Sequence, residues 1–154
     1  MENVIYLRPL RVDDAEVSWR WRNDSSLWKY TGHRPDCVVT EAMERQWADK
    51  VIHDASRLNY AICLVESQRY IGNIYIVNIE DSVGELGIFI GEKDCHGKGY
   101  GQQALELLKR EAKTHHIKKI KVGVNSGNIP ALVTYLKQGG VLLDSQWLNL
   151  ELTI

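Results

Sequence analysis

The chain has 154 residues, of which 44% are hydrophobic and 25% are charged, and its formal net charge is -1. This length predicts one domain spanning residues 1–154, and the charge excludes the basic excess typical of nucleic-acid-binding proteins. No apolar run is long enough to cross a membrane and no signal-peptide core is present, so we expect a cytoplasmic protein with no membrane partner. The three cysteines lack C-x-x-C spacing, which indicates reduced thiols and no metal site.

Two elements and a loop are predicted before residue 40. Apolar and polar residues alternate over 3–10, which predicts a first strand. Asp13 and Glu16 have capping-box spacing, so a helix should follow to about Arg22. Residues 23–38 contain a glycine, a proline and several polar side chains, and this composition predicts a loop.

A second helix is predicted to begin after Thr40, because a threonine hydroxyl can cap the first N–H groups of a helix. The apolar residues of this helix recur at four-residue spacing, which predicts a single stripe packed on the core. The residues of the stripe are Val39, Met43, Trp47 and Val51.

A sheet should form in the middle of the chain. Three β-rich runs at 58–65, 70–79 and 84–90 follow one another and predict an antiparallel meander. A helix at about 101–115 then leads to a strand at 117–124. A right-handed crossover makes this strand parallel to its predecessor, which creates a βαβ unit.

The rest of the chain predicts a last helix and two short strands. Asn128 can cap a helix that runs to about Gln138, and Gly139-Gly140 ends it. Residues 141–153 can form the two strands. The predicted fold class is therefore α+β, with a mixed, mostly antiparallel twisted sheet, one βαβ unit and about four flanking helices.

The most informative segment joins the strand at 84–90 to the helix that follows it. Its sequence at 96–101 is HGKGYG, and the three glycines let a ligand approach the main chain at the helix N-terminus. The G-x-G-x-G spacing matches neither the P-loop nor the dinucleotide fingerprint. The segment predicts a phosphate or pyrophosphate site, and a plain glycine turn between strand and helix is the alternative.

The polar residue at 96 and the glycines at 99 and 101 resemble the Q/R-x-x-G-x-G/A acetyl-CoA loop of the GNAT superfamily of N-acetyltransferases. Residues 124–131, Tyr135 and Gly139-Gly140 resemble the second half of that family's cofactor site. Trp21-Arg22-Asn23 is similar to the branch that includes ribosomal-protein and amino-sugar N-acetyltransferases. The resemblance implies a GNAT-type acyl-CoA N-acyltransferase fold over nearly the whole chain, with acetyl-CoA as cosubstrate. His96 stands where the family usually has Gln or Arg.

Acetyl-CoA should lie beyond the C-terminal end of the strand at 84–90. The glycine loop would bind its pyrophosphate through main-chain N–H groups, and Gly87 would let the strand bulge or splay so that the pantetheine arm reaches main-chain groups at 88–90. Asn125 and Asn128 either contact this arm or serve as turn former and helix N-cap. The predicted cofactor-binding residues are Ile88, Phe89, Ile90, His96, Gly97, Lys98, Gly99, Tyr100, Gly101, Gln102, Asn125, Asn128 and Tyr135.

Tyr135 and Glu85 are the predicted catalytic residues. The resemblance places the Tyr135 hydroxyl at the thioester sulfur, where it would protonate the departing thiolate; a half-buried core tyrosine is the alternative. Glu85 shares a strand face with Gly87 and Phe89. Burial on that face would raise its pKa and make it a base, whereas a charge that reaches water at the sheet edge is the alternative.

Tryptophans and arginines crowd the segment before the second predicted helix. They can stack on a base and bind phosphates, which suits a nucleotide-linked amino sugar, or they can form an amphipathic helix whose indoles pack on the sheet. The predicted acceptor-binding residues are Trp21, Arg22, Asn23 and Trp28, and Trp19, Arg20, His33 and Arg34 belong to the same segment.

We expect an N-acetyltransferase in which a primary amine attacks acetyl-CoA directly in a ternary complex, because the sequence offers no nucleophile in a recognisable setting. A nucleotide-linked amino sugar is the predicted acceptor. The alternatives are a protein N-terminus or another small amine and, in another class, an inactive acetyl-CoA-binding regulatory module. The predicted partners are acetyl-CoA and a small amine, with no metal, and the protein is a monomer or homodimer.

Overall fold

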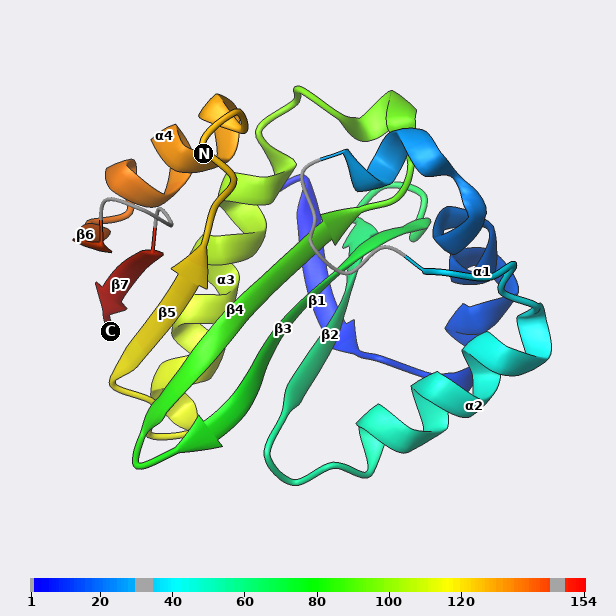
Figure 1. The fold of residues 1–154 in the computed structure, drawn as a ribbon, viewed down its shortest axis with the longest axis horizontal. Coiled ribbons are helices and arrows are strands. Elements are labelled where there is room, and N and C mark those ends of the chain that lie inside the picture. The colour runs from blue at the N-terminus through cyan, green and yellow to red at the C-terminus, as the bar shows by residue number, and fades with distance from the viewer. Residues whose placement is uncertain (1, 30–34, 145–148) are drawn as a thin grey trace.

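The computed structural model describes residues 2–29, 35–144 and 149–154. Its described residues form a seven-stranded sheet in the order β1-β2-β3-β4-β5-β7-β6 (Figure 1). All neighbouring strands are antiparallel except β4 and β5, which are parallel and confirm the predicted βαβ unit. The strands are β1 (Ile5–Pro9), β2 (Leu58–Leu64), β3 (Tyr70–Glu80), β4 (Val83–Ile90), β5 (Lys119–Gly123), β6 (Val141–Asp144) and β7 (Asn149–Thr153).

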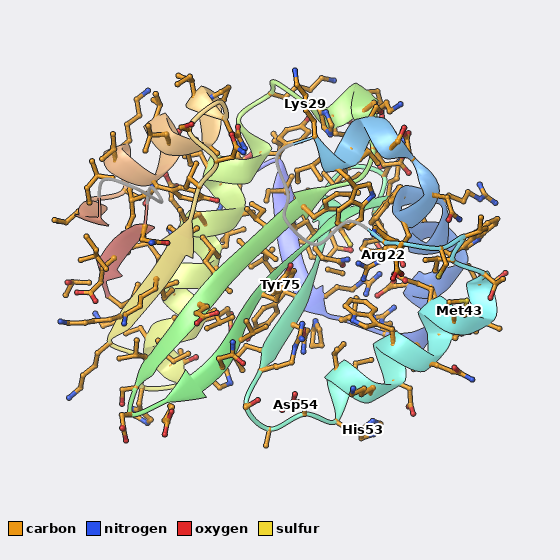
Figure 2. All side chains as sticks on the ribbon, in the orientation of Figure 1. Arg22, Lys29, Met43, His53, Asp54 and Tyr75 are labelled. Atoms are coloured by element: carbon orange, nitrogen blue, oxygen red, sulfur yellow. The ribbon has the colours of Figure 1, made fainter. Side chains whose placement is uncertain are left out.

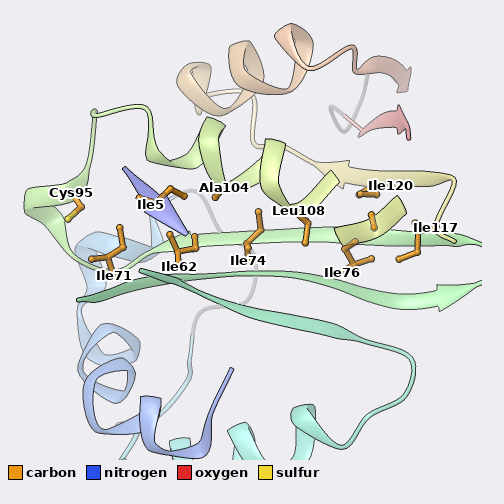
Figure 3. Packing of buried hydrophobic residues seen from close by; sticks show 11 residues of the cluster. Ile5, Ile62, Ile71, Ile74, Ile76, Cys95, Ala104, Leu108, Ile117 and Ile120 are labelled. Carbon is orange, nitrogen blue, oxygen red and sulfur yellow. The ribbon is translucent and has the colours of Figure 1, made fainter. Parts of the chain in front are cut away.

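Helices cover both faces of the sheet. Helices α1 and α2 lie on one face and α3 lies on the other, while α4 packs near α3 (Figures 1 and 3). The helices are α1 (Ala15–Asn23), α2 (Glu41–Ile52), α3 (Tyr100–Thr114) and α4 (Ile129–Lys137), and 3-10 turns occupy Val12–Asp14, Ser25–Trp28 and Lys93–Cys95. The α+β class and the order of elements are as the sequence predicts.

The main core lies between α3 and the sheet (Figure 3). Ala104, Leu108 and Ala112 recur at four-residue spacing on α3 and are fully buried. They meet the alternate residues Ile74 and Ile76 of β3, which face the helix because strand side chains alternate between the two faces. This packing fixes α3, and therefore the loop that precedes it, at the C-terminal end of β4.

The N-terminal capping prediction is wrong by two residues. Asp14, not Glu16, provides the carboxylate that bonds back to the N-cap main chain. It accepts a hydrogen bond of 2.8 Å from the main-chain N–H of Arg11 and forms an ion pair of 2.6 Å with Arg8. Asp13 instead pairs with Arg45 of α2 at 2.9 Å. The 3-10 turn Val12–Asp14 precedes α1, so the capping box belongs to this turn and the regular helix begins at Ala15.

The predicted stripe of α2 is also displaced. Thr40 does cap this helix, because its Oγ1 accepts a hydrogen bond of 3.2 Å from Met43 N–H. The buried face, however, carries Glu44, Ala48 and Val51, while Met43 is 42% exposed. A buried carboxylate on this face has a partner on α1, a tertiary contact that a four-residue period cannot reveal.

The predicted loop at 23–38 contains a short helix. Asp24 accepts a hydrogen bond of 3.1 Å from Ser26 N–H and so caps the turn Ser25–Trp28. His33 and Arg34 lie outside the described residues.

Strands β4 and β5 separate at the end that faces the glycine loop. Their pairing extends from Val83 to the Glu85–Lys121 pair, after which β5 continues only with β7 (Figure 1). The predicted splay is therefore present, but the register with β3 runs through Gly87 without a bulge. Gly87 is required for another reason, because a Cβ there would lie 2.0 Å from the ring of Tyr75.

None of the helices in the described ranges combines the length and the apolar character needed to cross a membrane.

Candidate active site

The loop between β4 and α3 exposes main-chain groups. Gly97 and Gly99 have φ angles of 71° and 79°, and no atom lies within 4 Å of a Cβ built at either position. Gly99 is the N-cap of α3. Within the described part of the chain, the N–H groups of residues 97–102 form no main-chain hydrogen bond. The positive end of α3 thus presents free donors to open space, which is what an anion requires.

The side chains of this loop mostly turn toward the protein. His96 donates from Nε2 to the carbonyl of Ile90 at 2.7 Å, which closes the loop onto the end of β4. Tyr100 packs against the main core, and the Gln102 amide donates to Glu106 at 3.4 Å. Lys98 is exposed. The predicted donors are therefore main-chain groups first, with Lys98 as the charged side chain nearest to them in sequence.

An unpredicted ion pair holds the segment that enters the loop. Arg69, in the turn between β2 and β3, forms two hydrogen bonds of 2.8 and 3.1 Å with Asp94 and an ion pair of 3.2 Å with Glu92. The bidentate geometry fixes direction as well as distance. The sequence carries no local signal for this contact because Arg69 and Asp94 are 25 residues apart.

A cavity of about 870 Å³ extends from the β4–β5 splay to helices α1 and α2. Several predicted site residues line it, so the fold brings together segments far apart in sequence: Ile88, Phe89, Asn125, Asn128 and Tyr135 at the splay, and Trp21, Arg22 and Trp28 toward α1 and α2. Ile90, Glu85, Asn23 and the loop residues 96–102 are not among its lining residues.

Tyr135 reaches the cavity from α4. The residue is 6% exposed, and its burial, with a smaller contribution from nearby Tyr75, raises the pKa of its hydroxyl to about 12. The hydroxyl forms no hydrogen bond with any described residue. It is consequently a neutral donor at ordinary pH that can serve a ligand in the cavity.

Glu85 lacks the burial on which its predicted base role depends. It is exposed, and its carboxylate accepts a hydrogen bond of 3.1 Å from Asn78. The two-residue period places it correctly on the face of Gly87 and Phe89, but α1 and α2 lie beside β1 and β2 and leave this end of β4 uncovered (Figure 1). The Glu85 carboxylate therefore stays in contact with water, and the burial expected from the sequence is absent.

Asn125 and Asn128 act in the turn before α4. Asn125 accepts a hydrogen bond of 2.9 Å from Gly127 N–H, which confirms the turn-forming role. Asn128 is the N-cap by position, but its side chain makes no capping hydrogen bond. Both side chains line the cavity. The Asn128 amide is therefore available to a ligand.

The tryptophans predicted to bind the acceptor, Trp21 and Trp28, pack on the sheet and also line the cavity. Trp28 stacks on Phe89 with ring centroids 4.9 Å apart, and its Nε1 donates to the Trp21 carbonyl at 2.9 Å. The Trp21 ring covers Gly91, where a Cβ would lie 2.0 Å from it. Asn23 has a structural role instead, because its side chain exchanges two hydrogen bonds of 2.8 Å with the main chain of Val39.

The same part of the cavity is lined by a buried carboxylate that the sequence did not indicate. Glu44 of α2 is 2% exposed and accepts hydrogen bonds from Ser18 at 2.8 Å and from Arg22 Nε at 3.1 Å. Arg22 in turn lies over the Trp47 ring, 4.5 Å from its centroid. Figure 2 shows Arg22 and Tyr75 on the same side of the sheet. The Arg22–Glu44 pair thus links α1 to α2 and leaves the two charges mutually neutralised.

The described residues contain no group of three His, Cys, Asp or Glu side chains that could hold a metal ion.

Comparison with known families agrees with this geometry. A family model described as an acetyltransferase (GNAT) domain matches residues 5–141. The chain belongs to the GNAT acetyltransferase family. The match covers the glycine loop, the splayed strands and Tyr135 of this GNAT domain.

One relative of this GNAT chain is alpha/beta-tubulin-N-acetyltransferase 9 of Homo sapiens. The two are 28% identical over 128 residues, which cover 76% of this chain and 62% of the human protein. The chain thus spans less than two thirds of the length of that relative.

Solved structures share the GNAT fold over almost the whole chain. The spermidine N-acetyltransferase of Vibrio cholerae, solved with CoA and spermine, has a TM-score of 0.85 at 18% identity, with coverage of 99% of this chain and 96% of that chain. An aminoglycoside acetyltransferase solved with coenzyme A has a TM-score of 0.79 at 20% identity, with coverage of 97% and 94%. At these identities the likeness establishes the fold.

Proposed function

We propose that the protein is an acetyl-CoA-dependent N-acetyltransferase, a single domain of residues 1–154, in which a primary amine attacks the thioester directly. One observation carries the proposal: a single cavity joins the β4–β5 splay and the Tyr135 hydroxyl to a wall of aromatic and cationic side chains. The splay lies beside a loop with free main-chain donors. A transferase needs two substrate sites that meet at one donor group, and this arrangement offers them.

The residues present fit acetyl-CoA. The open N–H groups at 97–102, with Lys98, suit the pyrophosphate, and Gly97 and Gly99 leave the approach free of side chains. The unpaired edge of β4 at 88–90 offers main-chain groups to the pantetheine arm, flanked by Asn125 and Asn128. Acetyl-CoA supplies the activated acyl group.

The chain contributes positioning and one proton. Tyr135 is held by burial with its hydroxyl toward the cavity, and a pKa of about 12 keeps that hydroxyl protonated at neutral pH. As the amine nitrogen bonds to the thioester carbon and the C–S bond breaks, the Tyr135 hydroxyl can donate its proton to the sulfur. The proton of the attacking amine leaves to water, and the Tyr135 phenolate recovers a proton from water. The excess of cationic side chains on the acceptor side lowers the pKa of a bound ammonium and favours the neutral, nucleophilic amine. Glu85 is not needed for this step.

A nucleotide-linked amino sugar is the acceptor that the cavity supports best. Trp28, Trp47 and Tyr75 offer aromatic faces, and Arg22 and Arg57 carry two positive charges against the one carboxylate among the described lining residues, Glu44. A polycationic amine of the spermidine type would be repelled by such a lining. The likeness to the human tubulin-N-acetyltransferase favours a second candidate, an amine of a protein.

The test is a screen of acceptor amines monitored by release of free CoA. The panel contains a nucleotide-linked amino sugar, spermidine and tubulin, each with a no-acceptor control. We expect turnover with the amino sugar and none with spermidine. Turnover with tubulin alone would transfer the acceptor assignment to a protein amine. CoA binding without turnover of any amine would contradict the enzyme assignment and favour an acetyl-CoA-binding regulatory module.

A further inference from the structure

The charges that line the acceptor side are not equivalent. Arg22 is neutralised by Glu44, and its Nε is occupied by that carboxylate at 3.1 Å. Arg57, in the segment between α2 and β2, was not expected from the sequence to belong to the site, yet it lines the same cavity. The contacts of the Arg57 guanidinium decide whether its charge is balanced.

Arg57 is held in place by neutral groups. Its Nε and Nη2 donate to Asn59 Oδ1 at 3.2 and 3.1 Å, and its guanidinium lies 5.4 Å from the centroid of the Tyr75 ring. Within the described residues, Nη1 has no hydrogen-bond partner and no carboxylate lies within 4.0 Å of the guanidinium. Arg57 is therefore oriented but not neutralised.

The Asp54 carboxylate does not neutralise Arg57 either. Its carboxylate accepts hydrogen bonds from the N–H and the hydroxyl of Ser56 at 2.9 and 2.6 Å. The main-chain N–H of Arg57 donates to the Asp54 carbonyl at 3.2 Å, but the Asp54 carboxylate acts on the Arg57 guanidinium only through space, and Figure 2 shows Asp54 in the loop at the edge of the molecule. Half-burial lowers the pKa of Arg57, and the nearby charge of Arg22 lowers it further. A half-buried cation with an unused donor is costly unless a bound anion pairs with it.

We propose that Arg57 is the specificity-determining residue of the acceptor site and binds an anionic group, a phosphate or a carboxylate, carried by the acceptor amine. The inference rests on the proposed function and narrows its substrate class. Asn59 and Tyr75 hold the guanidinium at the cavity and leave Nη1 without a hydrogen-bond partner among the described residues, and preorganised donors lose little freedom on binding. Charge-assisted hydrogen bonds of this kind are the strong ones.

Binding of three related amines tests the proposal. Protein saturated with CoA, so that the glycine loop is occupied, is titrated calorimetrically with glucosamine, glucosamine 6-phosphate and glucosaminate. We expect at least one of the two anionic amines to bind about tenfold or more tighter than glucosamine, because a charge-assisted hydrogen bond is worth at least that factor. The member that is preferred distinguishes a phosphate from a carboxylate.

Variants assign the preference to Arg57. Arg57→Gln should remove the difference in affinity between the anionic amines and glucosamine, whereas Arg57→Lys should retain part of the preference. Arg110→Gln on α3, an exposed arginine outside the cavity, is the matched control and should behave like the parent. The parent comparison stands even if a variant at position 57 fails to fold.

The outcomes separate the two proposals. Failure of the parent to bind CoA overturns the proposed function. CoA binding together with equal affinity for charged and neutral amines, or with binding of neither anionic amine, overturns the anion site alone. A preference that survives Arg57→Gln in a folded variant also overturns the role of Arg57.

Discussion

The glycine loop and the acceptor wall are built in different ways. The loop at 96–102 offers main-chain donors that follow from two glycines with positive φ angles and the start of one helix. The acceptor wall is the aromatic and cationic side of the cavity. Its side chains are Trp21, Arg22, Trp28, Glu44, Trp47, Arg57 and Tyr75, from α1, the turn Ser25–Trp28, α2, the segment before β2, and β3. Its geometry depends on contacts such as Arg22–Glu44 and Arg57–Tyr75 between segments far apart in sequence.

The two constructions suit different ligands. A main-chain site at a helix N-terminus suits any anion and needs little from side chains. A side-chain wall can be altered one residue at a time without disturbing the core between α3 and the sheet. Tyr135 lines the cavity from α4 and belongs to neither region, so changes to the loop, to the wall and to Tyr135 should have separable effects.

The largest effect is expected at Tyr135. Tyr135→Phe keeps the ring and removes the hydroxyl, and should lower the rate constant of acetyl transfer by roughly 10- to 10³-fold in single-turnover experiments. CoA affinity and thermal stability should be nearly unchanged. Because burial raises the Tyr135 pKa to about 12, the parent rate should show no loss from its ionisation up to about pH 11.

Tyr100→Phe is the matched control, since Tyr100 packs on the main core and does not line the cavity. It should leave the transfer rate unchanged. Transfer at the parent rate by Tyr135→Phe, or a melting temperature several degrees lower with CoA binding weakened in proportion, would make Tyr135 a packing residue.

Glu44→Gln should disrupt the contacts that hold the acceptor wall together. This change leaves Arg22 without its counter-ion and should cost about 2 kcal/mol in urea denaturation, less than the roughly 3–5 kcal/mol of a fully buried pair because the Arg22 side chain is 25% exposed. Acceptor KM should rise while CoA affinity is unchanged. Glu41→Gln removes an exposed partner of Arg45 and should leave stability within experimental error. Equal losses for both variants would show that Glu44 is not buried as described.

Gly99→Val should prevent the glycine loop from binding an anion. A valine at φ 79° is strained and places a side chain where the anion should lie, so CoA affinity should fall at least about tenfold. Gly139→Val is a matched control, because Gly139 has a φ of 86° and equally open surroundings at the end of α4. Both variants should lose similar stability, measured by thermal melting, but only Gly99→Val should lose CoA affinity. Equal CoA affinity in the two variants would remove the pyrophosphate from the loop.

The smallest effect is expected for His96→Ala. The His96 ring donates to the Ile90 carbonyl, so its loss should loosen the loop and weaken CoA binding by only about two- to threefold in calorimetry. His96→Gln, which can still donate to that carbonyl, should recover most of the loss. A tenfold or larger effect of His96→Ala would mean that the ring contacts the pyrophosphate directly.

Local patterns in the sequence predict the loop and most of the fold. Glycine spacing, the Thr40 cap and the β-rich runs act within a few residues, and the structure confirms the elements they predict. The two-residue period also gives Glu85 its correct face. It could not show that no helix covers that end of β4, because coverage depends on where α1 and α2 pack.

The acceptor wall could be predicted only in part. The sequence identified Trp21, Trp28 and Arg22, but not Trp47, Glu44, Arg57 or Tyr75. Glu44 lies one residue from the expected stripe and is buried because Arg22 and Ser18 meet it. Arg57 follows a helix in a polar segment with no local signature. A glycine at position 87, opposite Tyr75 in the register, is the single sequence feature that reports the close approach of that ring.

A crystal structure of the protein with CoA would show whether the glycine loop, the splay and Tyr135 form one cofactor site. We expect the pyrophosphate to lie against the N–H groups of residues 97–102, the pantetheine arm to lie in the β4–β5 splay, and the sulfur to lie within hydrogen-bond distance of the Tyr135 hydroxyl. A CoA molecule bound elsewhere, or a sulfur separated from Tyr135 by the width of the cavity, would contradict this expectation.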